Sequence, residues 1–159
     1  MAKLLEFEIT TPERTVLKEQ VLSVSVPTES GEITVLAGHI PLIAPVPAGE
    51  LRAVRADGSE EFMAVSGGFV TVMGDGRIVI LADTAERAEE LDLAAIEEAK
   101  ARATRVMAEK HDDAERHADA AAGLAREMAR WKVANRYRSL KGLGTTTKIE
   151  PQTPKETES

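Results

Sequence analysis

The hydrophobic pattern of this chain changes its period once, between residues 82 and 90. Before this point apolar and polar residues alternate, as in LEFEI at 5–9 and LSVSV at 22–26, which is the period of half-buried strands. After it, apolar residues recur every three or four positions, which is the spacing of one helix face. The chain is therefore expected to have a β + α fold, with strands first and helices last.

The first part, residues 1–86, is predicted to form an antiparallel β-sandwich domain. Further segments rich in apolar and β-branched residues are EFMAV at 61–65, GFVTVM at 68–73 and RIVILA at 77–82. Asp57-Gly58 and Asp75-Gly76 fall between strand segments and are typical of tight hairpin turns. Many short strands at this spacing favour a sandwich or a barrel.

Residues 87–141 are predicted to form an antiparallel two-helix hairpin. Asp92 is a suitable N-cap for the first helix, and Asp112 or Asp113 for the second. The predicted apolar faces consist of Leu93, Ile96, Ala99, Ala103 and Val106 on the first helix and of Ala121, Leu124, Met128, Trp131 and Ala134 on the second. Because alanine buries little area, the hairpin is expected to dock weakly and to be movable, with the polar stretch 86–90 as a hinge.

The remaining residues, 142–159, are polar and contain glycine, proline and several threonines, so a disordered tail is expected. The N-terminal MAKLLEFEIT has glutamates inside its apolar run, unlike a signal peptide. No segment approaches the roughly 18 apolar residues that a membrane-spanning helix needs. The protein is therefore expected to be soluble and cytoplasmic, with membrane association only through a partner.

Residues that carry chemistry are scarce. The chain has no cysteine and 3 histidines, which excludes thiolate chemistry and argues against a histidine-rich metal site. KGLGTTTK at 141–148 lacks the spacing of a phosphate loop, and VSGGF at 65–69 lacks a nucleophile–base pair. His39 lies in a predicted loop without an acid cluster, which favours a structural or interface role. No catalytic residue, metal or cofactor is expected.

Charge is distributed unevenly along the chain, whose formal net charge is −7. Residues 1–90 carry 7 basic and 15 acidic side chains, whereas residues 124–141 carry 6 basic and 1 acidic side chain. The acidic first part argues against nucleic acid as a partner. The basic run consists of Arg126, Arg130, Lys132, Arg136, Arg138 and Lys141. A solvated helix face is one interpretation of this run. Because Glu127 is the one acid within it, the sequence favours an acidic partner.

Three blocks of the sequence resemble the epsilon subunit of bacterial F-type ATP synthases. The matching positions in the first block, SGEITVLAGHIPLIAPVPAGELR at 30–52, are Gly31, Glu32, Gly38, His39, Pro41, Leu42 and Gly49. The other blocks are VSGGFVTV at 65–72 and ILADTAERAEELD at 80–92. Thr34 and Ala37 stand where the family commonly has glycine and proline, which affects local loop geometry.

This resemblance implies a sandwich of about ten strands that binds the gamma subunit and sits on the ring of c subunits, with Glu32 and His39 facing the ring. The hairpin would either fold against the sandwich or extend into the catalytic head. When extended, it would place Arg126, Arg130, Lys132 and Arg136 against acidic surfaces of the alpha and beta subunits and inhibit ATP hydrolysis. The resemblance thus implies a non-catalytic subunit, peripheral at the cytoplasmic face of the bacterial inner membrane.

The resemblance also offers an alternative function, a stand-alone nucleotide-sensing module of the same fold. Some bacterial members of the family bind ATP through an Ile/Leu-Asp-x-x-Arg-Ala motif and further arginines. Leu91 and Asp92 match this motif, and Arg102 and Arg136 match the further arginines, but Ala95 and Ile96 replace its arginine and alanine. The lost charge removes a charge-assisted phosphate contact, so ATP binding is expected to be weak or absent. A small sandwich enzyme is the third hypothesis, and it lacks a nucleophile–base pair or metal set.

Overall fold

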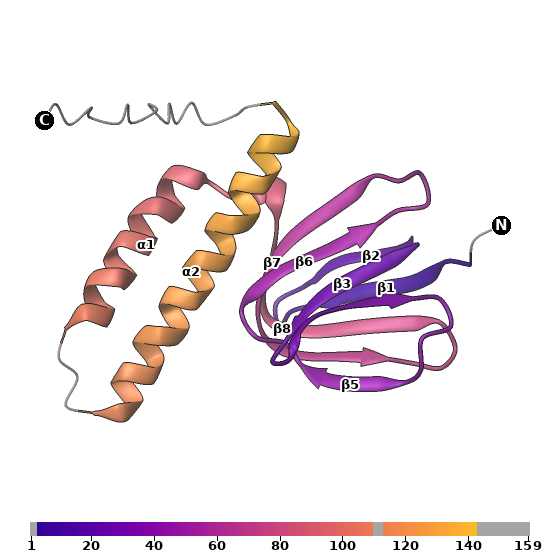
Figure 1. Cartoon of the computed structure of the whole chain (residues 1–159), viewed down its shortest axis with the longest axis horizontal. Coiled ribbons are helices and arrows are strands. Elements are labelled where there is room, and N and C mark those ends of the chain that lie inside the picture. The colour runs from indigo at the N-terminus through magenta and orange to yellow at the C-terminus, as the bar shows by residue number, and fades with distance from the viewer. Residues whose placement is uncertain (1–2, 110–112, 143–159) are drawn as a thin grey trace, which may run out of the picture.

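The computed structural model describes residues 3–109 and 113–142, which form eight strands, a short 3-10 helix and two α-helices (Figure 1). The strands are β1 (Leu5–Thr10), β2 (Thr15–Val21), β3 (Ser23–Thr28), β4 (Gly31–Leu36), β5 (Leu42–Pro45), β6 (Gly49–Val54), β7 (Glu60–Val72) and β8 (Arg77–Arg87). They are followed by η1 (Ala88–Glu90), α1 (Leu93–Ala108) and α2 (Ala114–Leu140). The order of strands before helices confirms the predicted β + α fold.

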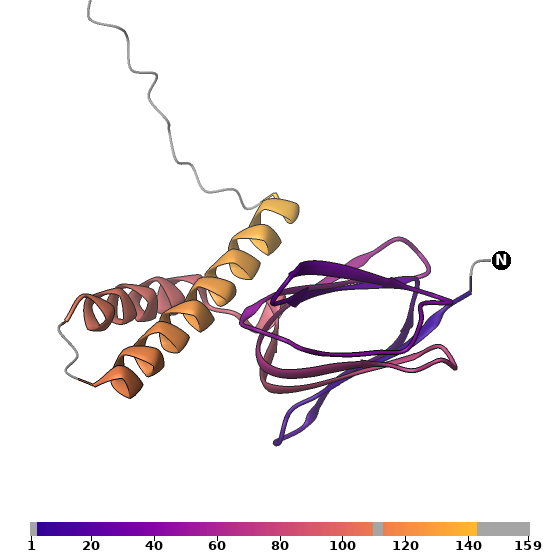
Figure 2. The same ribbon diagram turned by 60° about the horizontal axis from the view of Figure 1, so that its bottom comes forward.

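The strands form one sheet that curves into the two layers of a sandwich (Figure 2). Their order is β2-β1-β8-β7-β6-β3-β4, and β5 pairs with β7 beside this path. All neighbours are antiparallel except β1 and β8, which run parallel with Phe7 opposite Ile78. This parallel pair joins the beginning of the domain to its last strand.

The sheet has eight strands, close to the expected number of about ten, and two of the predicted segments form one strand. EFMAV and GFVTVM both belong to β7, which pairs with β6 through residues 60–65 and with β5 through residues 69–72. Between these halves Ser66 lies opposite Thr84 and Gly68 opposite Ala82, so the register is kept and Gly67 is level with Asp83. Gly67 and Gly68 have φ values of 68° and 117°, in the left-handed region that favours glycine, and a Cβ on Gly67 would collide with the Asp83 carboxylate.

The interior of the sandwich is aliphatic, as the low aromatic content predicts. Alternating residues of each strand point inward, so that Phe7, Ile9, Ile78 and Ile80 are fully buried. The rest of this core comes from every strand and from Val46, which follows β5. The sandwich therefore has its own core, independent of the helices.

The two helices form a hairpin in which α2 lies between the sandwich and α1 (Figure 1). The Asp92 carboxylate accepts from the backbone N–H groups of Ala94 and Ala95 at 3.0 and 3.3 Å, and Asp113 accepts from that of Glu115 at 2.9 Å. These contacts confirm the predicted N-caps Asp92 and Asp113. Asp112 and, apart from Gly142, the predicted tail at 142–159 lie outside the described residues.

The predicted apolar faces are wrong at Val106 on α1 and at Met128 on α2, which are 43% and 51% exposed. The buried residues of α2 are Ala129, Val133 and Ala134, and the first two lie on a different face of the helix from Met128. The reason is that α2 has two neighbours. One face packs on the sandwich, and another meets α1, where the Lys100 ammonium lies 4.2 Å from the centre of the Trp131 ring.

Candidate functional site: the docking face between the sandwich and the second helix

The sandwich and α2 meet through a small apolar cluster. Phe62 and Ala64 of β7, Ala88 of η1 and Val133 of α2 are buried there, with Leu91 and Tyr137 packed at its edge. Two of the four central residues are alanines, so the cluster buries few large side chains. Burial of a valine or phenylalanine contributes roughly 1.5–3 kcal/mol each, which makes this a modest interface.

An ion pair crosses the interface beside this cluster. Nε of Arg136 on α2 donates to Oε2 of Glu50 on β6 at 2.9 Å. The Glu50 side chain is only 7% exposed, whereas that of Arg136 is 45% exposed. The guanidinium carbon of Arg136 also lies 5.4 Å from the centre of the Phe62 ring, within cation–π range. Arg136 therefore contacts both the acidic and the apolar part of the sandwich face.

A second ion pair crosses the interface at Arg130. Its Nε lies 2.6 Å from Oε2 of Glu86 on β8, and its Nη1 lies 3.0 Å from Oε2 of Glu127 on α2 itself. Burial alone would lower the pKa of Arg130, but Glu86 and Glu127 outweigh it and raise that pKa. Arg130 is thus a fully ionised residue held by acids from both domains.

These pairs correct the sequence-based view that the basic run lacks acidic neighbours. The partners come from the sandwich, 44 residues away for Glu86 and 86 residues away for Glu50. Local spacing therefore could not reveal them. Arg126 and Lys132 differ, because both are exposed and neither forms an ion pair with a residue that the structure describes.

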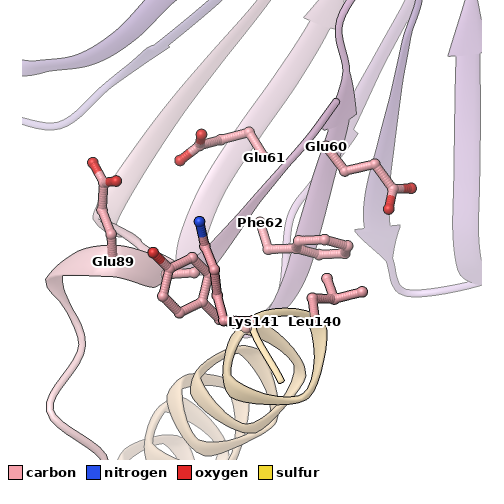
Figure 3. A pocket seen from close by; sticks show the side chains of 8 residues that line it. Glu60, Glu61, Phe62, Glu89, Leu140 and Lys141 are labelled. Atoms are coloured by element: carbon pink, nitrogen blue, oxygen red, sulfur yellow. The ribbon is translucent and has the colours of Figure 1, made fainter. Parts of the chain in front are cut away.

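A cleft of about 210 Å³ opens where the end of α2 meets the sandwich (Figure 3). Glu60, Glu61 and Phe62 line it from β7, and Leu140 and Lys141 line it from the end of α2. The Lys141 ammonium lies 5.6 Å from the centre of the Tyr137 ring, which also lines the cleft. The ammonium group of Lys141 therefore supplies a positive charge to this acidic cleft.

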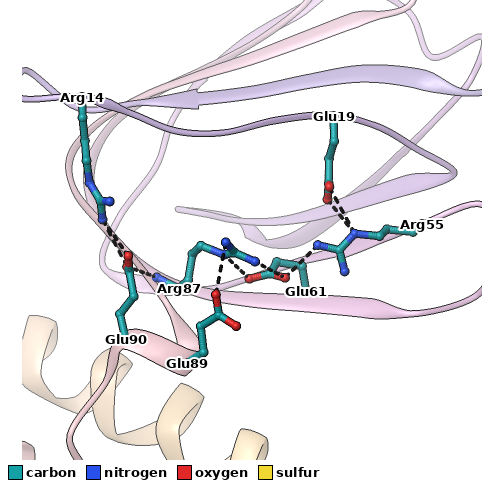
Figure 4. A network of polar contacts seen from close by, with 7 residues as sticks. All are labelled: Arg14, Glu19, Arg55, Glu61, Arg87, Glu89 and Glu90. Carbon is teal, nitrogen blue, oxygen red and sulfur yellow. Dashed lines mark hydrogen bonds and ion pairs between the residues drawn. The ribbon is translucent and has the colours of Figure 1, made fainter.

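A chain of ion pairs holds the end of β8 and η1 on the sandwich (Figure 4). Its centre is Glu61, which binds Arg87 at 2.7 Å and Arg55 at 2.8 Å. Further pairs extend it, from Arg55 to Glu19 at 3.0 Å and from Arg14 to Glu90 at 3.0 Å. Burial opposes ionisation of Glu61, but Arg87 and Arg55 outweigh it, so the pKa of Glu61 lies below its ordinary value.

This network bears on the predicted hinge at 86–90. Glu86 binds Arg130, Arg87 binds Glu61, and Glu90 accepts from the backbone N–H of Arg87 as well as from Arg14. A segment fixed at so many points is a poor hinge. Leu91 and Asp92 then connect η1 to α1, and Leu91 packs at the edge of the apolar cluster.

The two predicted ring-facing residues lie at opposite ends of β4. Glu32 is exposed at the start of the strand, and His39 is half-buried in the loop after its end. Nδ1 of His39 donates to the carbonyl oxygen of Ile40 at 2.6 Å, which fixes the imidazole ring. Leu36 lies four residue steps, roughly 13 Å, along the strand from Glu32, so the loop that holds His39 begins well away from Glu32.

The sequence did not predict the exposed apolar face on β5, β7 and β8. Ile43, Phe69 and Leu81 are 71%, 55% and 60% exposed. Phe69 lies opposite Leu81 on one side and opposite the exposed Pro45 on the other. Ile43 lies two residues before Pro45 on the same face of β5, so these residues together form an outward apolar row across three strands. A groove of about 450 Å³ adjoins it, lined in part by Phe69, Leu81 and Pro12. Exposed apolar surface of this kind marks a protein interface.

The residues of the degenerate nucleotide motif are not gathered at one place. The carboxylate of Asp92 caps α1, and the guanidinium of Arg136 binds Glu50. Lys100 packs on Trp131, so Arg102 and Arg136 lie on opposite sides of this contact, roughly 10 Å apart along the hairpin. Arg102 pairs with Glu98 at 4.0 Å on α1. Three of the four matching residues are thus engaged elsewhere.

Residues 3–109 and 113–142 contain neither a membrane-spanning helix nor a metal-binding cluster. None of the helices there combines the length and apolar character needed to cross a membrane. The same residues contain no group of three or more histidine, aspartate and glutamate side chains arranged to hold a metal ion.

A sandwich with an outer helical hairpin defines a class of known proteins. Residues 4–88 match the family model of the ATP synthase delta/epsilon chain, beta-sandwich domain. The chain is also similar to the ATP synthase epsilon chain of Dehalococcoides mccartyi, with 47% identity over 87% of this chain and 96% of that one. The epsilon chain of Moorella thermoacetica is 44% identical over 82% of this chain and 96% of that one.

Solved structures share the same fold at low identity. A chain of the Euglena gracilis mitochondrial ATP synthase, solved with OSCP, F1 and c-ring, superposes with a TM-score of 0.71 at 23% identity, over 82% of this chain and 81% of that one. A chain of the Tetrahymena thermophila mitochondrial ATP synthase, solved as central stalk and c-ring, superposes with a TM-score of 0.61 at 14% identity, over 84% of this chain and 98% of that one. The chain belongs to the ATP synthase epsilon chain family, which confirms the resemblance seen in its sequence.

Proposed function

We propose that this chain is a non-catalytic epsilon subunit in the central stalk of a bacterial rotary ATP synthase. Membership of the epsilon chain family supports this role, as does the match to relatives over 96% of their length. The subunit would lie at the cytoplasmic face of the inner membrane and reach the membrane only through its complex. It would transmit rotation between the c-ring, the gamma subunit and the catalytic head, without binding nucleic acid.

The sandwich offers two surfaces for these partners. Glu32 and His39, at the two ends of β4, would contact loops of the c-ring. The apolar row of Ile43, Phe69 and Leu81 would contact the gamma subunit, since an exposed row of this kind suits a permanent protein partner better than water. Cysteines placed at Glu32 or His39 should then cross-link to c-subunit loops in the assembled enzyme. Their failure to do so with activity retained would contradict this placement.

The hairpin would regulate the enzyme by moving. In the docked position of this structure, α2 lies on the sandwich. In an extended position Arg126, Arg130, Lys132 and Arg136 would face acidic surfaces of the alpha and beta subunits and inhibit ATP hydrolysis. The observation that carries this proposal is the composition of the docking face, where a small apolar cluster is flanked by ion pairs. Such a face is reversible, because ionic contacts elsewhere can replace those it loses.

The test is removal of the hairpin in the assembled enzyme. A chain cut after Glu90 keeps the sandwich core and the ion pair between Arg14 and Glu90. We expect faster ATP hydrolysis with ATP synthesis largely kept. A chain cut after Gly142 is the matched control, since it keeps both helices, and it should hydrolyse ATP like the full chain. Equal hydrolysis by all three enzymes across salt concentrations would show that the hairpin does not inhibit.

A further inference from the structure

We propose that Glu50 and Glu86 form an acceptor site on the sandwich that competes with the catalytic head for Arg136 and Arg130, and so keeps the hairpin docked. The inference rests on the proposed inhibition by the hairpin and names the residues that oppose it. Both acids belong to strands of the sandwich, β6 and β8, and both bind α2 rather than only their own domain. The sequence pattern of α2 alone does not predict these two acids as its partners.

The two arginines flank the centre of the docking face. Val133 is fully buried and lies three residues after Arg130 and three residues before Arg136. Six residues of helix span about 9 Å and turn through about 240°, so the two guanidinium groups leave α2 on different sides of the Val133 contact. One binds Glu86 and the other binds Glu50, which places an ionic contact on each side of the apolar cluster.

The two halves of the Arg136–Glu50 pair differ in what they lose when it breaks. Arg136 is nearly half exposed and is readily hydrated, whereas the Glu50 carboxylate is almost buried and, among the described residues, has its ion pair with Arg136 alone. In the docked position, loss of Arg136 leaves a buried carboxylate without a cation, which is costly. Glu50 therefore selects for a guanidinium at this point of α2, and undocking returns its carboxylate to water.

The same guanidinium groups serve both positions of the hairpin, but the acids differ. Substitution of Arg130 or Arg136 weakens both the docked contact and the contact with the catalytic head. Because these two losses act on inhibition in opposite directions, the net change in inhibition should be small. Glu50 and Glu86 contribute to the docked position only. Their substitution should therefore have an effect of opposite sign to removal of the hairpin, with more inhibition rather than less.

The first experiment uses the isolated full-length chain and measures hydrogen exchange of the α2 amides. In the double variant Glu50→Gln and Glu86→Gln, we expect exchange in α2 to be about fivefold faster, since two partly exposed ion pairs are lost. Glu6→Gln is the control, because Glu6 is exposed on β1 and outside the docking face. Glu50→Asp should recover part of the protection. Equal α2 exchange in the wild type and the double variant would overturn the inference.

The second experiment measures ATP hydrolysis by the assembled enzyme. The double variant should hydrolyse ATP about two- to fivefold more slowly than the wild type, while the Glu6→Gln enzyme should hydrolyse ATP at the wild-type rate. Its inhibition should disappear when the same chain is cut after Glu90. If α2 exchange rises but hydrolysis does not fall, in an enzyme that truncation activates, the competition is absent and the inference fails. If truncation itself has no effect, the proposed inhibition fails, and the exchange experiment still decides whether Glu50 and Glu86 hold α2.

Discussion

Arg130 of α2 binds Glu86 of β8 with 2.6 Å between Nε and Oε2, which joins the hairpin to the last strand of the sandwich. Glu86 lies directly before Arg87, the residue through which Glu61 holds the end of β8. The docked helix and the segment leading to the hairpin are therefore fixed on the same short stretch of chain. Release of α2 needs loss of the first contact but not of the second.

The basic residues of α2 are expected to fall into two groups. Arg126 and Lys132 have no ion pair with a described residue, so their substitution leaves the docked position intact. Arg126→Ala with Lys132→Ala should raise ATP hydrolysis by the assembled enzyme about two- to fivefold at low salt, because only head contacts are lost. The measurement is hydrolysis rate against ionic strength, and the gain should shrink at high salt.

Arg130→Ala with Arg136→Ala is the informative comparison for this prediction. It removes two contacts from each position of the hairpin, so its hydrolysis rate should lie closer to that of the wild type. A larger activation by this pair than by the Arg126 and Lys132 pair would contradict the division into two groups.

The stability of the sandwich should depend on the charge of Glu61. Glu61→Gln removes both ionic contacts at the centre of the network and should lower the free energy of unfolding by roughly 1–3 kcal/mol at pH 7. The pKa of Glu61 is lowered in the folded chain, so its stabilisation is present above the ordinary carboxyl pKa and is lost as the pH falls through the lowered value. Urea unfolding of both proteins at pH 7, 5 and 3 should show the difference narrowing below about pH 4.

Glu6→Gln is the control for the pH series, because Glu6 is exposed on β1 and outside this network. It should change the unfolding midpoint little at any of the three pH values. A Glu61→Gln deficit that is constant from pH 7 to pH 3 would show that the lost contacts are not ionic.

The sequence predicted the parts of the molecule that depend on local patterns. The alternation of apolar residues predicted the sandwich, and the capping side chains Asp92 and Asp113 predicted where both helices begin. The burial of Met128 was predicted wrongly, because a helix with two neighbours has two buried faces and its sequence does not say which neighbour each one meets. Glu50 and Glu86 could not be predicted as partners of Arg136 and Arg130, because ion pairs across 86 and 44 residues depend on how the domains pack.

ATP binding by the isolated chain is expected to be weak or absent. Ala95 replaces the arginine of the family motif, and the side chains of Asp92 and Arg136 are engaged in contacts within the chain. Loss of one charge-assisted contact corresponds to about a tenfold to hundredfold loss of affinity. Calorimetry should detect no micromolar binding by the wild type, and Ala95→Arg should strengthen whatever binding remains. Micromolar ATP binding by the unaltered chain would contradict the interpretation that Ala95 weakens the nucleotide motif.

The apolar row on β5, β7 and β8 should be needed for assembly but not for folding. Phe69 and Leu81 face outward and are more than half exposed, so their polar substitution removes little from the core. Phe69→Ser with Leu81→Ser should leave the unfolding midpoint nearly unchanged and weaken binding to the isolated gamma subunit about tenfold to a hundredfold, as loss of two interface anchors typically does. Leu36→Ser is the matched control, because Leu36 is 57% exposed on β4 and lies outside the row. If the Leu36 variant loses as much affinity as the double variant, or if the double variant binds gamma like the wild type, the gamma-binding surface lies on another face of the sandwich.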